Sequence, residues 1–113
     1  MVKKSANYGI LYNKVAIVTG GASGIGEGIC LEFASHGATI AIADINYQGA
    51  AMVIKKIQES GGKGIALKVD VCNYKKIRET VSKVLEDFGT IDILVNCAGW
   101  NRLKPVYEYS IEE

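Results

Sequence analysis

Apolar and polar positions follow two periods along this chain, one typical of buried strands and one typical of amphipathic helices. Short apolar runs rich in Val, Ile and Ala predict strands at 14–19, 39–43, 65–69 and 91–96. Segments with apolar residues at helical spacing lie between them and predict helices at 24–35, 46–60 and 73–88. Strands separated by helices are parallel with right-handed crossovers. The pattern therefore predicts an α/β fold with a doubly wound parallel sheet in the order 3-2-1-4.

The apolar spacing also predicts which face each helix buries. For the first helix these residues are Ile25, Ile29, Cys30, Phe33 and Ala34. For the second they are Ala50, Val53, Ile54 and Ile57, and for the third Ile77, Val81, Val84, Leu85 and Phe88. Asn46 and Asn73 are expected N-caps, and Gly37 and Gly89 are expected to end helices. Residues 1–12 are expected to form an arm or a short edge strand.

The glycine-rich turn after the first strand carries the strongest chemical signal. Residues 19–26 read T-G-G-A-S-G-I-G and lead directly into a helix. Glycines allow a tight turn and let a pyrophosphate approach the backbone, and the helix N-terminus presents unpaired N–H groups to the anion. An ordinary strand-to-helix turn can contain glycines too, but both flanks required of a nucleotide loop are present here. The candidate phosphate-binding residues are Gly20, Ser23, Gly24, Ile25 and Gly26.

The spacing of this turn separates it from two other nucleotide loops. The fingerprint G-x-G-x-x-G would need a glycine where Ile29 stands, and a Walker loop would need a lysine where Glu27 stands. Three further motifs end strands: Asp44-Ile45, Asp70-Val71 and Asn96-Cys97-Ala98-Gly99. With T-G-x-x-x-G-I-G, they resemble the short-chain dehydrogenase/reductase family over residues 14–113. The resemblance implies one partial, Rossmann-type NAD(P)-binding domain over residues 1–113, truncated before the fifth strand.

Each of these strand-end motifs predicts one contact with a dinucleotide. A carboxylate at Asp44 can accept both hydroxyls of the adenosine ribose, beside Ile45, although an acid there could also serve the helix that follows. The resemblance implies that Asp70 and Val71 contact adenine and that Asn96, Ala98 and Gly99 lie near the cofactor. Cys97 replaces the second Asn of the family pattern, so that residue's role does not transfer to it. Ser23 and residues 45–48 are not basic, which favours NAD over NADP.

The catalytic residues implied by the resemblance are missing from the sequence. In the family a Tyr acts as general acid/base, a Lys four residues later lowers its pKa, and a Ser orients the substrate oxygen. None of the six tyrosines here has a Lys four positions later. Ser110 to Glu113 forms a capping box that announces a further helix. We therefore expect the catalytic residues beyond Glu113, and residues 1–113 alone are expected to be inactive.

Composition excludes several other classes. Thirteen basic and twelve acidic residues give a net charge of +1, which provides no basic surface for nucleic acid. The apolar runs are too short to span a membrane, and the N-terminus does not read as a signal peptide, so a cytoplasmic protein is expected. The three cysteines are unpaired by spacing and are expected to be reduced and mostly buried, with no metal role. They are Cys30, Cys72 and Cys97.

The resemblance implies hydride transfer between a nicotinamide and the carbon of a small alcohol, ketone or acyl thioester, in a homo-oligomer, as a dimer or tetramer. Two alternatives remain open at this point. One is a dinucleotide-sensing module without catalysis, which the residues after Glu113 would decide. The other is a transferase that uses S-adenosylmethionine, whose fold also places an acid on a ribose. Thr19, Gly24 and the Asn96 motif speak against the transferase.

Overall fold

The computed structural model describes residues 9–98, in which strands and helices alternate as the sequence pattern predicts. The strands are β1 (Val15–Thr19), β2 (Thr39–Asp44), β3 (Lys63–Lys68) and β4 (Ile93–Asn96). The helices are α1 (Gly24–Ser35), α2 (Tyr47–Glu59) and α3 (Tyr74–Phe88). All strand pairs are parallel and their order is β3-β2-β1-β4, which confirms the predicted fold class.

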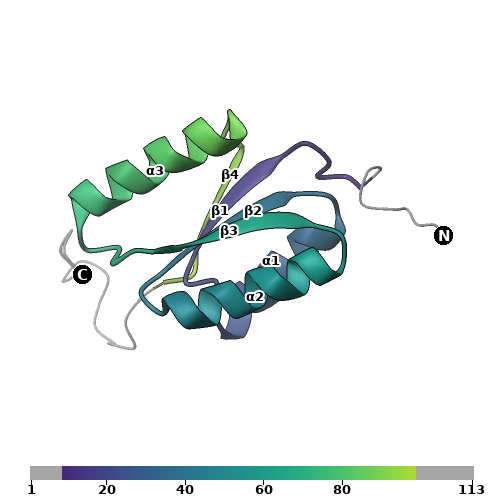
Figure 1. Cartoon of the computed structure of the whole chain (residues 1–113), viewed down its shortest axis with the longest axis horizontal. Coiled ribbons are helices and arrows are strands. Elements are labelled where there is room, and N and C mark those ends of the chain that lie inside the picture. Colours follow the sequence, from purple (N-terminus) through teal and green to yellow (C-terminus); the bar gives the residue numbers. More distant parts are fainter. Residues whose placement is uncertain (1–8, 99–113) are drawn as a thin grey trace, which may run out of the picture.

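The sheet separates two layers of helices (Figure 1). Helices α1 and α2 cover one face, and α3 lies against the other. Strand β1 is central: Ala16 pairs with Ile40 of β2 on one side and with Ile93 of β4 on the other. Strands β2 and β3 thus lie on one side of β1, and β4 lies on the other side. The strand order reverses at β1, and the loop after β1 lies at this reversal point.

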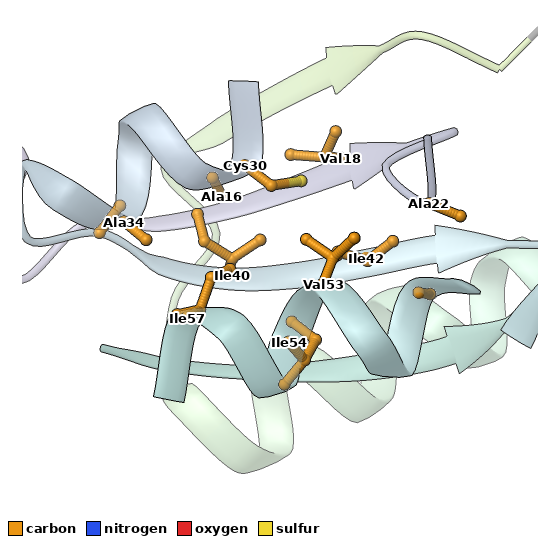
Figure 2. Packing of buried hydrophobic residues seen from close by; sticks show 12 residues of the cluster. Ala16, Val18, Ala22, Cys30, Ala34, Ile40, Ile42, Val53, Ile54 and Ile57 are labelled. Carbon is orange, nitrogen blue, oxygen red and sulfur yellow. The ribbon is translucent and has the colours of Figure 1, made fainter. Parts of the chain in front are cut away.

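The larger hydrophobic cluster fills the space between the sheet and the helices α1 and α2 (Figure 2). Its strand residues are Ala16, Val18, Ile40 and Ile42, and its helix residues include Cys30, Ala34, Val53, Ile54 and Ile57. Burying one such isoleucine completely contributes about 1.5–3 kcal/mol. The predicted buried face of α2 is confirmed, since its buried residues are the four that the spacing predicted.

The predicted face of α1 is wrong at its first residue. Ile25 is 80% exposed, and the buried row is Gly26, Cys30 and Ala34 instead. Ile25 lies about 100° around the helix from that row, because successive residues of an α-helix are rotated by this angle. The buried row thus contains small side chains, which lets α1 lie close to the sheet.

The predicted face of α3 is wrong at Val81 and Leu85, which are both exposed. The buried residues of this helix are Thr80 and Val84, while Ile77 and Phe88 are half-buried. In the described part of the chain α3 is the only helix on its side of the sheet. No second helix therefore covers Val81 and Leu85 on this side of the sheet in the described part of the chain, and both side chains stay exposed.

Two strand boundaries differ from the sequence prediction. Strand β3 begins at Lys63 rather than 65 because Lys63 pairs with Thr39 at the start of β2, and it ends at Lys68. Strand β4 begins at Ile93 rather than 91. Just before it, Asp92 is bonded to Val15 twice: its N–H donates to the Val15 carbonyl at 2.8 Å, and its carboxylate accepts the Val15 N–H at 2.8 Å. A side-chain acceptor thus supplements the backbone bond at this point, and the regular ladder starts one residue later.

The helix ends follow the predicted capping residues. The side-chain oxygen of Asn46 accepts the Gly49 N–H at 3.0 Å, and that of Asn73 accepts the Lys76 N–H at 3.1 Å. Gly37 and Gly89 have left-handed φ values of 98° and 83°, which favour glycine. These predictions are confirmed.

The expected N-terminal arm lies mostly outside the described residues, which begin with a turn over 9–13. The Leu11 N–H donates to the His36 carbonyl at 2.8 Å, and this bond fixes the turn beside the end of α1. The helix predicted from Ser110 also lies outside the described residues. Within residues 9–98 no helix has the length and apolarity needed to cross a membrane.

Candidate functional site

The carboxyl ends of β1, β2 and β4 meet at one edge of the sheet. Thr19, the last residue of β1, pairs with Ala43 of β2 and with Asn96 of β4. The glycine-rich loop leaves this edge and enters α1. In doubly wound sheets, ligands bind in the crevice at such a reversal point. The topology therefore assembles most of the predicted site residues at one place.

The glycines of the loop have opposite surroundings. A Cβ on Gly20 would lie 2.5 Å from the Ala98 backbone nitrogen, and a Cβ on Gly26 would overlap the Gly20 carbonyl oxygen. These two glycines permit close packing of loop, strand end and helix. Gly24 has a φ of +60°, and a Cβ built on it would meet no heavy atom within 4 Å. The backbone at Gly24 is thus open on the outside, and a phosphate group needs such access to bind there.

The N-terminus of α1 faces the same open side. Ser23 is the N-cap with extended backbone, yet its exposed side chain makes no capping hydrogen bond. The first N–H groups of an α-helix have no partner within the helix, and here the first one bonded back is Glu27, which donates to the Ser23 carbonyl at 3.3 Å. Unpaired donors and the positive helix end together favour an anion.

Thr19 ties the ends of β1 and β4 together. Its hydroxyl accepts the Cys97 N–H at 3.2 Å and lies 3.1 Å from the Asn96 side-chain oxygen, to which it can donate. The Cys97 N–H also reaches the Thr19 carbonyl at 2.9 Å. In the sequence, Thr19 stands out only as the first residue of the glycine-rich motif. A hydroxyl at the last residue of a central strand was the signal for this role.

Asp44, the last residue of β2, connects three segments. Its Oδ2 accepts the Ala22 N–H of the glycine loop at 3.1 Å, and its Oδ1 accepts the Asn46 N–H at 2.8 Å. The side chain is half-buried, so the carboxylate has both a protein side and a solvent side. The two hydrogen bonds thus hold the Asp44 carboxylate beside the glycine loop, whose outer side is open to an anion.

The remaining predicted residues lie around this centre. Asp70 follows β3, one strand further from the loop; it is exposed, and its Oδ1 accepts the Cys72 N–H at 2.9 Å. Val71 is half-buried, and Ile45 is exposed beside Asp44. Ala98 contacts the loop at Gly20, as described above. Gly99 lies outside the described residues.

The three cysteines differ in burial. Cys30 is fully buried behind the loop, and burial, with smaller contributions from Cys97 and Glu27, raises the pKa of its thiol to about 12. Cys97 is half-buried. Cys72 is exposed because it lies in the turn after β3, so the prediction of mostly buried thiols is wrong there. No three His, Cys, Asp or Glu side chains within residues 9–98 gather as metal ligands.

Comparison with known proteins agrees with this geometry. A sequence profile of the family described as short chain dehydrogenase matches residues 14–113. The chain belongs to the short-chain dehydrogenase family. This family consists of oxidoreductases that act on hydroxyl groups with a dinucleotide cofactor.

Individual members of the family are similar over most of this chain. A short chain dehydrogenase of Pseudocercospora fijiensis is 42% identical over 100 residues, which are 88% of this chain and 32% of the relative. The structure of a hydroxysteroid dehydrogenase from Escherichia coli matches with a TM-score of 0.80 and 36% identity over 91% of this chain and 43% of that one.

The structure of an NAD⁺-bound xylitol dehydrogenase matches with a TM-score of 0.79 and 32% identity over 89% of this chain and 39% of that one. The chain spans 32% to 40% of the length of most of the curated relatives that it matches, and 15% of one of them.

Proposed function

We propose that this chain is the cofactor-binding part of an NAD-dependent oxidoreductase. The whole protein would transfer hydride between the nicotinamide and the carbon of a small alcohol or ketone, or of an acyl thioester. The observation that carries the proposal is the hydrogen bond from the Ala22 N–H to the Asp44 carboxylate, which holds this carboxylate beside the glycine loop. An anion-accepting backbone and a fixed carboxylate lie side by side, and a nucleotide offers a pyrophosphate and a ribose at such neighbouring positions.

The residues present fit a dinucleotide. Ser23, Gly24 and Ile25 present an open backbone and a hydroxyl that is not used in capping, which suit a pyrophosphate. We assign the two ribose hydroxyls to the solvent side of the Asp44 carboxylate. Ile45 and Val71 would provide apolar surface for the adenine, with Asp70 near its amine.

The remaining roles concern the reacting end of the cofactor. Asn96, Ala98 and Gly99 would bound that end, where Thr19 holds the end of β4 in place. Bound NAD supplies the carbon that accepts or donates hydride. The general acid/base that moves the substrate proton would come from residues after Glu113, since no tyrosine of this chain has a lysine four positions later.

The preference for NAD over NADP follows from charge. The 2′-phosphate of NADP would face the Asp44 carboxylate, and the following residues Ile45, Asn46, Tyr47 and Gln48 supply no cation. Like charges at hydrogen-bond distance repel each other, and the ribose hydroxyls of NAD instead donate to the carboxylate. The NAD⁺-bound xylitol dehydrogenase among the similar structures supports the same choice.

Fluorescence titration of the complete protein with NADH and NADPH tests the proposal. NADH should bind more tightly, and Asp44→Ala should weaken NADH by about 1.5–3 kcal/mol, the usual contribution of hydrogen bonds to a charged group. Glu86→Ala is the matched control, because it removes one negative charge from an exposed position on α3. Equal or tighter binding of NADPH by the unmodified protein would overturn the proposed cofactor.

A further inference from the structure

The Asp44 carboxylate contacts the glycine loop directly, and this contact has a function of its own. We propose that Asp44 is a positioning residue that holds the phosphate loop in its binding conformation, in addition to receiving the ribose. The inference rests on the proposed function for the identity of the ligand. It rests on this chain's own geometry for the contact between Asp44 and Ala22.

Ala22 is the midpoint of the loop and is held from two directions. Its N–H donates to Asp44 Oδ2 at 3.1 Å, although the two residues are 22 positions apart in the sequence. Its side chain is buried, and a Cβ placed on Gly49 at the start of α2 would lie 3.2 Å from the Ala22 Cβ. Ser23 and Gly24 follow immediately. The tether therefore lies directly before the residues whose open backbone suits a phosphate.

Two of the acceptor positions of the Asp44 carboxylate are used by backbone N–H groups, and two are left for a ligand. A carboxylate has two oxygens with about four lone-pair positions. The backbone N–H groups of Ala22 and Asn46 take one position on each oxygen. One position on each oxygen is left, which matches the two hydroxyl donors of a ribose. The two backbone bonds also fix the plane of the carboxylate, because rotating the side chain would break both.

This arrangement predicts that removing the carboxylate affects more than the ribose. In Asp44→Ala the Ala22 N–H loses its acceptor, so this part of the loop is no longer tethered to β2, while the Gly20 N–H still donates to the Ala43 carbonyl at 3.0 Å. The affinity for the pyrophosphate should then fall even when the ligand has no ribose hydroxyls. Asp44→Asn should be intermediate, since its amide oxygen can still accept one of the two N–H groups while its NH₂ faces the other.

The deciding experiment compares ADP with 2′,3′-dideoxy-ADP, which keeps the adenine and the diphosphate and lacks both hydroxyls. Isothermal titration of the complete protein, of Asp44→Ala, of Asp44→Asn and of the control Glu86→Ala gives all affinities. Asp44→Ala should weaken dideoxy-ADP by about 5-fold or more, and ADP by about 10-fold or more, as expected when charge-assisted hydrogen bonds are lost. An affinity for dideoxy-ADP within about two-fold of the unmodified protein would overturn the tether.

Amide hydrogen exchange in the ligand-free protein provides a readout that no ribose contact can change. Exchange at Ala22 should accelerate by about 10-fold in Asp44→Ala, because a tethered amide becomes a free one, whereas exchange at Ile17 in the centre of β1 should stay constant. Unchanged exchange at Ala22 overturns the tether, and so does equal acceleration at Ile17, which would mean general loosening. If the unmodified protein binds neither nucleotide, the proposed function fails, and the exchange at Ala22 alone then decides the tether.

Discussion

The inner and outer sides of the glycine loop differ sharply in how tightly they are packed. On the inner side, Gly20 and Gly26 pack against backbone, and the Sγ of Cys30 would lie 2.8 Å from a Cβ on Gly21. On the outer side, Gly24 has open space around it, and Ile25 is 80% exposed. Glycine is required on both sides for different reasons: lack of space inside, and backbone shape and access outside.

The difference separates residues that hold the fold from residues available to a ligand. Substitutions on the inner side should change stability first and binding as a consequence. Substitutions on the outer side should change binding while the fold persists. Five predictions test this division, beginning with the largest expected effect.

The first prediction concerns the reactivity of Cys30 on the inner side. Because burial raises the pKa of its thiol from 9.0 to about 12, about 1000-fold less thiolate is present near neutral pH than for an ordinary cysteine. Alkylation of the folded protein with iodoacetamide at pH 8, followed by mass spectrometry, should modify Cys72 and leave Cys30 intact. Equal labelling of the two cysteines would show that the inner side is open.

The same pKa shift makes a stability contribution that depends on pH. The pKa of Cys30 is higher in the folded than in the unfolded state, so the folded state is favoured while the thiol is protonated. The contribution is fully present below about pH 9 and is lost as the pH rises toward 12. Replacing Cys30 by Ala should make the free energy of unfolding less dependent on pH in this range.

The second prediction is that Gly26→Val destabilises the protein by about 3 kcal/mol or more, at the upper end of the usual cost of overpacking. Its Cβ would overlap the Gly20 carbonyl oxygen, so α1 would have to move away from β1. Urea denaturation followed by circular dichroism measures the effect. A midpoint equal to that of the unmodified protein would contradict the close packing described here.

The third prediction is that Gly24→Val weakens NADH by about 100-fold or more, or about 2.7 kcal/mol, and leaves the protein folded. Its left-handed φ of +60° costs a branched residue roughly 1–2 kcal/mol of stability, and the side chain stands on the open side of the loop. Near-normal NADH affinity in a folded variant would show that the outer side does not receive the phosphates.

The smallest effect is expected for Gly28→Ala, one turn further along α1. A Cβ there meets no heavy atom within 4 Å, and the residue is exposed within the helix. Alanine should stabilise the protein by about 0.5–1 kcal/mol, because glycine loses more conformational freedom in a helix. Thermal melting measures the gain, and a destabilised variant would contradict the open surroundings of Gly28.

Local features of the chain were predictable from sequence. Asn46 and Asn73 bond to backbone three residues later, and Gly89 adopts a conformation that glycine favours, so their immediate neighbours decide their roles. The fold class followed from the alternation of strands and helices. The site residues could be placed at one sheet edge because the carboxyl ends of parallel strands meet there.

Features that depend on distant neighbours were not predictable. The apolar spacing predicted that Ile25 and Leu85 are buried, but both are exposed. Tertiary packing decides which side of a helix faces the sheet, and in both helices the adjacent residue, Gly26 or Val84, is buried instead. The start of β3 is decided by its pairing with β2. The bond from Ala22 to Asp44 joins residues from two elements, and no pattern along the sequence encodes their distance.

The strand order also gives the site a sequence of assembly in time. Ala22 and Asp44 are 22 residues apart and belong to consecutive strand–helix units, whereas Val15 and Asp92, which join β1 to β4, are 77 residues apart. Contacts between residues that are far apart in the sequence form more slowly, because a longer loop must close. We therefore expect the corner between the loop and Asp44 to form before the contacts of β1 with β4.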